Sequence, residues 1–349
     1  MNLETNPYVQ DILSQADALQ NALARFDMTP LKPITSIVRR GGFDRIVLTG
    51  MGASFYAAYP IWLRLVQAGL PAYWLDASEL IHHARPLLTG KTLLWVFSQS
   101  GRSAEIIALL EQYEQDSMTL LATVNDLSSP LARTAGDFVI PLWAQPEQSV
   151  STRTYLNTLA LSQLAALVLT DDDARIGIQQ LQATAAAIFE YLADWKKHLQ
   201  EIRSQIKLTR NLVLLGRGYS LAAVYTGALI LGEAAKVGAI GLQAGEFRHG
   251  PLELAGPELT ALLFAGPLET QPLMARLHYD LLQIGARSIW VAPLNSPSLK
   301  PQIPMPDVTG IGAPLAEILP IQLLTLHLAA ELGVEAGKFL HIGKVTLSE

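Results

Sequence analysis

Short apolar runs alternate with helical stretches along most of the chain. Four runs lie in the first half, at 46–50, 95–97, 120–125 and 137–139. Four more lie in the second half, at 212–216, 262–264, 290–295 and 307–309. Runs of this length, separated by stretches of helical length, are typical of βαβ units. The pattern predicts an α/β fold with a mainly parallel sheet in each half, buried on both faces.

The two halves repeat one another without gaps in the register that pairs Gly50 with Gly216. In that register a Gly-x-Gly-x-Ser turn follows an apolar strand in both halves, and Ser54 matches Ser220. Any two α/β segments share some likeness, but a common turn in the same local context favours a duplication. We therefore expect two copies of one fold.

Two helices are predicted outside the repeated units. One covers Tyr8–Phe26, ahead of a segment broken by Pro30 and Pro33. The other, Ile178–Ile206, has apolar residues at helical spacing and is expected to bridge the halves as an amphipathic helix. The predicted divisions are a helix and lead-in at 1–34, a first subdomain at 35–175, a linker helix at 176–208, a second subdomain at 209–335 and a C-terminal tail at 336–349.

The composition of the chain limits the kinds of partner that it is expected to bind. The 349 residues include 25 Lys and Arg against 31 Asp and Glu, a net charge of −6, which argues against binding to nucleic acid or to an anionic membrane. The most apolar region, Leu221–Leu242, contains Glu233 and Lys236, so a buried helix explains it better than a membrane span. Met1–Thr5 shows no signal-peptide pattern. A chain without cysteine can have no disulfide and no cysteine nucleophile, and it fits a cytoplasmic location.

Hydroxyl-rich turns follow three strands of the first half. They are Gly50–Ser54, Ser98–Ser103 and Ser149–Arg153, and at least two of them open helices. Serine and threonine before a helix are most often simple N-caps. Three such turns at the strand ends of one sheet favour a neutral cradle for a phosphate group, built from hydroxyls and helix-start N–H groups.

The matching turn of the second half lacks these features. It reads Ala265–Leu268, without hydroxyls, and Pro267 removes a backbone N–H. The second half is therefore expected to bind phosphate poorly and to be available to supply the catalytic residues. A dinucleotide site is disfavoured because the third glycine of that fingerprint is missing after Gly52, and no P-loop occurs.

Glu233 and His249 are the candidate acid–base residues. Glu233 stands in an apolar, small-residue helical stretch, where burial would raise the pKa of its carboxyl group. The competing interpretation is a salt bridge to Lys236 or to another cation. His249 precedes Gly250-Pro251 in a loop, where a structural histidine is the alternative. The two together, in the half without a cradle, favour the catalytic interpretation.

These motifs together resemble the sugar isomerase (SIS) family. The quoted motifs are Gly50-x-Gly52-x-Ser54, Ser98-Gln99-Ser100-Gly101-x-Ser103, Ser151-Thr152-Arg153, and Glu233 followed by His249-Gly250-Pro251. More narrowly, the chain is similar to the isomerase half of glucosamine-6-phosphate synthase and to the fructosamine-6-phosphate deglycases. The resemblance implies two flavodoxin-like subdomains, each a three-layer α/β/α unit, in a homodimer with the active site at the interface.

The resemblance also implies roles for single residues. The sugar phosphate would be held by Gly52, Ser54, Ser98, Gln99, Ser100, Ser103 and Ser151. Glu233 would move a proton between C1 and C2, and His249, reaching into the partner's site, would assist ring opening or proton transfer. Lys344 would be catalytic, in a C-terminal tail that closes over the site. No metal and no cofactor are implied.

Several departures bear on the activity. The synthase has a glutaminase domain with a cysteine nucleophile, and this sequence has neither, so glutaminase activity is expected to be absent. Arg102 replaces an acid, and Thr226 and Ile230 replace a glutamate and a lysine. In a gapless alignment Lys344 falls one position away from the synthase lysine that forms a Schiff base.

We therefore expect a deglycase or deaminase that acts on a 6-phosphorylated ketosamine such as fructosamine 6-phosphate. One alternative is an aldose–ketose or amino-sugar-phosphate isomerase without hydrolysis, because it would use the same residues. A second alternative is a non-catalytic regulator that binds a sugar phosphate. Such a regulator would need the cradle but not Glu233.

Overall fold

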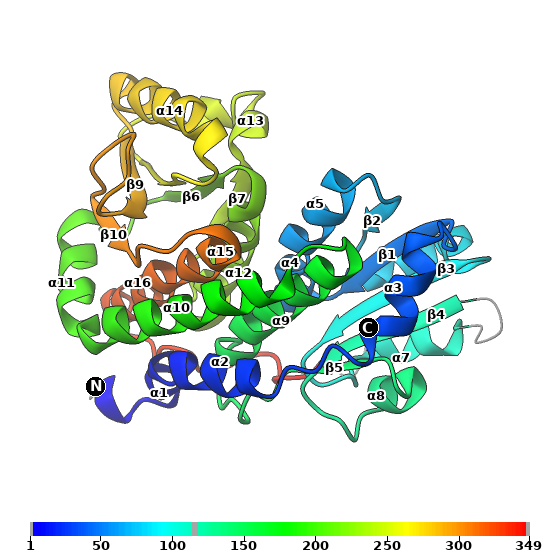
Figure 1. Ribbon diagram of the computed structural model, residues 1–349. Coiled ribbons are helices and arrows are strands. Elements are labelled where there is room, and N and C mark those ends of the chain that lie inside the picture. Colours follow the sequence, from blue (N-terminus) through cyan, green and yellow to red (C-terminus); the bar gives the residue numbers. More distant parts are fainter. Residues whose placement is uncertain (1–2, 114–117, 347–349) are drawn as a thin grey trace. The chain divides into compact units, whose positions relative to one another are not determined.

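The computed structural model describes residues 3–113 and 118–346, which form two compact units (Figure 1). The first-sheet unit comprises 17–113, 118–147, 151–182 and 340–346. The second-sheet unit comprises 3–16, 148–150 and 183–339. Each unit contains one sheet with its own hydrophobic core, and each is described by itself.

The first sheet is fully parallel, with the strand order β2-β1-β3-β4-β5. Its strands are β1 (Arg45–Gly50), β2 (Ala72–Trp74), β3 (Thr92–Ser98), β4 (Met118–Val124) and β5 (Val139–Pro141). Every residue of the central strand β3 is buried. Such a strand needs apolar side chains on both faces, which explains its continuous apolar run.

Helices cover both faces of this sheet. On one face, Val47, Leu94 and Val96 pack against residues of the helices α6 (Ala77–His82), α7 (Ala104–Glu111) and α8 (Pro130–Ala135). The other layer consists of α3 (Leu31–Arg39), α4 (Gly52–Ala57), α5 (Tyr59–Gln67) and α9 (Arg153–Leu169), which pack together. The unit is therefore a three-layer α/β/α structure.

The second sheet repeats this design, with the order β10-β9-β8-β6-β7. Its strands are β6 (Asn211–Gly216), β7 (Ile240–Gln243), β8 (Leu259–Phe264), β9 (Arg287–Pro293) and β10 (Ile303–Met305). The helices α13 (Ala244–Phe247) and α14 (Gln271–Ile284) share one core with the sheet. The helices α11 (Trp195–Gln205), α12 (Leu221–Ala235), α15 (Ala313–Ala316) and α16 (Ile318–Glu331) form the other layer.

The predicted fold of two parallel α/β subdomains is confirmed, and the two sheets follow the same strand order, that of flavodoxin. The strands β2 and β7 were not predicted from the sequence, and the last strand lies earlier than predicted. Both missed strands are short, lie at a sheet edge and are half exposed, so neither has an apolar run. Residues 307–309 form no strand, and β10 ends at Met305.

The predicted helices differ from the observed ones in three places. The helix expected at 8–26 is two helices, α1 (Pro7–Leu13) and α2 (Gln15–Ala24). Pro33 does not break the chain but lies in the first turn of α3, where the N–H that proline lacks has no partner within the helix. The expected linker is also two helices, α10 (Ala174–Ala193) and α11, which meet at Asp194. Short 3₁₀ turns lie at Leu3–Thr5, Arg85–Leu88, Gly218–Ser220, Pro251–Leu254, Leu268–Thr270 and Gly310–Gly312.

One described segment, Gly310–Glu331, is long and apolar enough to cross a membrane by length and composition. The sequence analysis had instead singled out the region around α12. The apolar window within Gly310–Glu331 is entirely buried, and α16 packs against α11 and α12 of the same unit. This burial accounts for its composition, so the segment is weak evidence for a membrane span.

Glu317 is a carboxyl group buried at the start of α16. It is 1% exposed, and the Ser220 hydroxyl donates to its Oε1 at 2.6 Å. Its Oε2 has no partner within the described part of the chain. Burial raises the pKa of Glu317 to about 8, against the opposing effect of the Ser220 hydrogen bond. The folded protein therefore retains a proton that the unfolded chain releases near its ordinary pKa of 4.5.

At Glu317 the folded state binds more protons than the unfolded state between pH 4.5 and about 8, so the contribution of this group to stability falls as pH rises through this range. Glu317→Gln removes this proton. Relative to wild type, it should gain about 1.4 kcal/mol in the free energy of unfolding for each pH unit in that range. Urea unfolding at pH 5, 6.5 and 8 measures the difference. Parallel pH profiles for the two proteins would contradict the assignment.

Candidate active site

The turn after β3 contains two serine hydroxyls that accept backbone hydrogen bonds within the turn. Ser98 ends the strand, and its Oγ accepts the Gly101 N–H at 3.0 Å. The Oγ of Ser100 accepts the Arg102 N–H at 3.2 Å. Gly101 has φ +60°, and a Cβ there would lie 2.4 Å from Ser129 Oγ, so only glycine fits. Since both hydroxyls act as acceptors, their own protons remain available for an anion.

The turn continues into α7 through Ser103. Ser103 is the N-cap residue, but its side chain makes no capping hydrogen bond, so it is not the simple N-cap considered as an alternative. The Ala104 N–H at the helix start donates to the Thr346 carbonyl of the C-terminal segment at 3.1 Å. The Gln99 carbonyl accepts the N–H groups of Asn125 and Asp126 from the turn after β4.

Ser54 lies in the first turn of α4, which follows β1 directly. Gly52 opens this helix with φ +53°, a conformation that favours glycine, and Ser54 is half-buried. The last residue of β1, Gly50, lies opposite Phe97 of the neighbouring strand β3. The Ser54 turn and the Ser98 turn therefore leave the same edge of the sheet from adjacent strands. The strand order reverses between these two strands, which is where open α/β sheets bind ligands.

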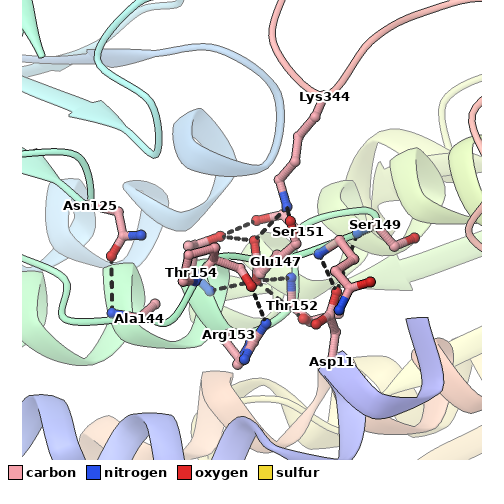
Figure 2. A network of polar contacts seen from close by, with 12 residues as sticks. Asp11, Asn125, Ala144, Glu147, Ser149, Ser151, Thr152, Arg153, Thr154 and Lys344 are labelled. Atoms are coloured by element: carbon pink, nitrogen blue, oxygen red, sulfur yellow. Dashed lines mark hydrogen bonds and ion pairs between the residues drawn. The ribbon is translucent and has the colours of Figure 1, made fainter. Parts of the chain in front are cut away.

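The third turn differs from the expected cradle because a carboxylate already occupies it (Figure 2). Glu147 Oε1 accepts the N–H groups of Thr152 at 2.9 Å and Thr154 at 2.8 Å, at the start of α9. These amides are therefore not free for a phosphate. Ser151 Oγ shares a 2.8 Å hydrogen bond with Thr154 Oγ1. A role for Ser151 in phosphate binding remains a prediction.

Lys344 lies in the same unit as Glu147 and contacts it. Its Nζ donates to the Glu147 backbone carbonyl at 2.8 Å and lies 3.4 Å from the carboxylate Oε2 (Figure 2). The sequence analysis named Lys344 but missed Glu147. The available signal was an acid a few positions before a hydroxyl-rich helix start, the place where a carboxylate accepts helix N–H groups.

Glu233 lies near the C-terminal end of α12 in the second-sheet unit. Burial raises the pKa of its carboxyl group to about 7, opposed by the charge of Lys236. The competing salt bridge does not form, because the Lys236 ammonium donates to the Glu233 backbone carbonyl and to the Lys338 carbonyl. A carboxyl group with this pKa can both accept and return a proton near neutral pH.

Glu233 is not at the carboxyl edge of the second sheet. The helix α12 starts at that edge after β6, and Glu233 lies about 18 Å further along its axis at 1.5 Å per residue. At the carboxyl edge itself the turns after β6 and β8 approach closely, since a Cβ on Gly218 would lie 2.7 Å from the Pro267 Cγ. Ser220 there donates to Glu317. This packing fits the expectation that the second half binds phosphate poorly.

His249 is exposed in the turn after α13. Its backbone N–H donates to the Glu246 carbonyl at 2.8 Å. Its ring makes no hydrogen bond or ion pair with any residue of 3–113 or 118–346, so the structure does not join it to Glu233. A role in a neighbouring subunit remains a prediction.

Comparison with known proteins agrees with this geometry. Residues 43–168 match the family model for the SIS domain. A glutamine–fructose-6-phosphate aminotransferase (isomerizing) from Pyrococcus horikoshii is 30% identical over 82% of this chain, which covers 49% of that protein. The chain thus spans about half the length of this curated relative.

Solved structures share the fold. The C-terminal domain of glucosamine-fructose-6-phosphate aminotransferase from Francisella tularensis superposes with a TM-score of 0.84 at 19% identity, covering 97% of this chain and 100% of that chain. Tagatose-6-phosphate ketose/aldose isomerase from Escherichia coli gives 0.78 at 18% identity, with 95% of each chain covered. The resemblance inferred from the residues is thereby confirmed.

Replacing Ser98 and Ser100 together by alanine should weaken binding of a hexose 6-phosphate. Each lost hydroxyl removes a hydrogen bond to a charged group, so affinity should fall roughly 100-fold or more for the pair. Isothermal titration calorimetry measures the change, with the exposed Ser204→Ala as control. Unchanged affinity in the double variant would place the phosphate elsewhere.

Proposed function

Since residues 43–168 of the chain belong to the SIS domain family, we propose that it is a phosphosugar enzyme of the isomerase type. The proposed substrate is a 6-phosphorylated ketosamine such as fructosamine 6-phosphate, and the proposed activity is that of a deglycase or deaminase. The observation that carries the proposal is Glu233, a carboxyl group in an apolar helix whose pKa is raised to about 7.

The proposed reaction is a proton shuttle followed by hydrolysis. Ser54, Ser98, Gln99, Ser100 and Ser103, together with Gly52 and Ser151, hold the phosphate. Glu233 removes the proton from C1, which carries the amine, and a proton is returned to C2. The ketosamine thereby becomes the C1 imine of the aldose. Water adds to this imine, and the C–N bond breaks to release an amine and a hexose 6-phosphate.

Lys344 and His249 complete the proposed set. His249 assists ring opening or proton transfer, and Lys344 brings its amine to the substrate from the C-terminal tail. Hydrolysis of glutamine is not part of the proposal, because these 349 residues contain no cysteine nucleophile. The proposal includes a homodimer with the active site at its interface, a cytoplasmic location, and no metal, cofactor or nucleic-acid partner.

An isomerase without hydrolysis is the second candidate. The likeness in fold to the Escherichia coli ketose/aldose isomerase favours it, and proton transfer between C1 and C2 would use the same Glu233. The reaction products distinguish the deglycase from the isomerase. A deglycase releases free amine from fructosamine 6-phosphate, whereas an isomerase interconverts hexose phosphates only. Binding of the sugars without turnover would support the regulator instead.

Glu233→Gln should lower kcat roughly 10²- to 10⁴-fold, the range that general acid–base catalysis contributes. For wild type, kcat/KM should rise with pH through about 7, because the carboxyl group must lose its proton to act as a base. Release of hexose phosphate and amine is followed from pH 5.5 to 8.5. Turnover that survives the substitution would remove Glu233 from the mechanism.

Mixing two inactive variants tests the shared site. If His249 serves the neighbouring subunit, a mixture of Glu233→Gln and His249→Asn proteins should recover up to about a quarter of wild-type activity, since only mixed dimers contain one intact site. The measurement is activity after subunit exchange. If activity does not recover in a mixture that is shown to contain mixed dimers, each active site is formed by one chain alone.

A further inference from the structure

Glu147 is a fully buried carboxylate with an unusually complete set of donors. Its side chain is 0% exposed. Oε1 accepts two backbone N–H groups and the Thr152 hydroxyl, and Oε2 accepts the Thr154 hydroxyl at 2.7 Å. A buried charge is tolerated only with such compensation. The start of α9 therefore fixes the position of this carboxylate before any other group is considered.

Lys344 is the cation that completes this environment. Its side chain is 27% exposed, although its backbone lies in the exposed C-terminal segment. The amine contacts Glu147 twice, through the backbone carbonyl and the carboxylate. Figure 2 shows it reaching from the tail toward the α9 start, next to Ser151. The Thr346 carbonyl, two residues further on, bonds Ala104 at the start of α7.

A second lysine–glutamate pair provides the contrast. Lys338 Nζ lies 3.1 Å from Glu335 Oε2, but the two side chains are 60% and 42% exposed. Exposed pairs of this kind are mobile and contribute little. Glu147, in contrast, is itself held by four donors, so it offers the lysine one defined position rather than a range of positions.

We propose that Glu147 is the positioning residue for Lys344, holding its amine at the start of α9 beside the hydroxyl turns. The consequence for catalysis rests on the proposed function, because it assumes that Lys344 acts on the substrate. The placement of the Lys344 amine does not depend on the proposed function. The two claims therefore have separate tests.

Amine labelling tests the placement without reference to any activity. The full chain is exposed briefly to acetic anhydride, and acetylation at Lys344 and Lys338 is quantified by mass spectrometry. Lys344 should be labelled several-fold more slowly than Lys338 in wild type, and this protection should be lost in Glu147→Gln. The matched control, Glu335→Gln, should leave the Lys344 rate unchanged. Unchanged protection of Lys344 in Glu147→Gln would overturn the proposal.

A second variant, Glu147→Asp, distinguishes loss of the contact with Lys344 from a folding defect in Glu147→Gln. It keeps the charge and a partner for the α9 amides but withdraws the carboxylate from Lys344 by one methylene. Its far-ultraviolet circular dichroism should match wild type while Lys344 labelling rises. Full protection of Lys344 in a folded Glu147→Asp protein would equally contradict the proposal.

Kinetics then test the catalytic consequence. Glu147→Gln and Lys344→Met should each lower kcat at least tenfold with little change in KM, and the double variant should be no slower than Lys344→Met alone. Additive losses would show that Glu147 acts independently of Lys344 and overturn the proposal. If Lys344→Met retains full activity while the labelling result holds, the placement stands and the catalytic role of Lys344 in the proposed function fails.

Discussion

A carboxyl group can be buried only if donors compensate its charge or if it keeps its proton. Two buried glutamates, Glu147 and Glu317, and the partly buried Glu233 meet this constraint in different ways. Glu147 receives four donors and an ammonium group and serves as an anchor. Glu317 has a single hydroxyl donor, and its pKa is raised to about 8. Glu233 does not form the salt bridge to Lys236 that was the competing interpretation. Its pKa is raised to about 7, so both the protonated and the ionised state are populated near neutral pH. Differences of this kind between the surroundings of carboxyl groups fit them for different roles.

The same constraint explains why two copies of one fold have diverged. At the switch point of the first sheet, the turn after β3 contains two serine hydroxyls that act as hydrogen-bond acceptors, a role that does not use their own protons. At the corresponding edge of the second sheet, Ser220 is already bonded to Glu317, a residue that stands in the repeat where Ser151 stands in the first half. One carboxyl group and one proline thus lie at the edge where the first sheet has its serine turns. Both units keep the architecture, whereas the hydroxyl turns that are proposed to bind an anion occur only in the first half of the sequence.

Local sequence patterns predicted what depends on local physics. The central strands were predictable because burial on both faces demands continuous apolar runs, whereas β2 and β7 lie at half-exposed edges and leave no such signal. Glu233 could be singled out because a charge in an apolar helix is conspicuous in the sequence. The contacts of Glu147 with Lys344 and of Ala104 with Thr346 could not be predicted, since each joins residues that are far apart in the chain.

The C-terminal segment makes such distant contacts within each of the two units. Within the second-sheet unit, the Gly337 N–H donates to the Ala234 carbonyl at 3.0 Å, one residue from Glu233. Within the first-sheet unit, Lys344 and Thr346 bond the starts of α9 and α7. Because backbone amides and carbonyls make several of these bonds, substitutions in this segment can leave them intact, and the side chain whose replacement is most informative is the amine of Lys344.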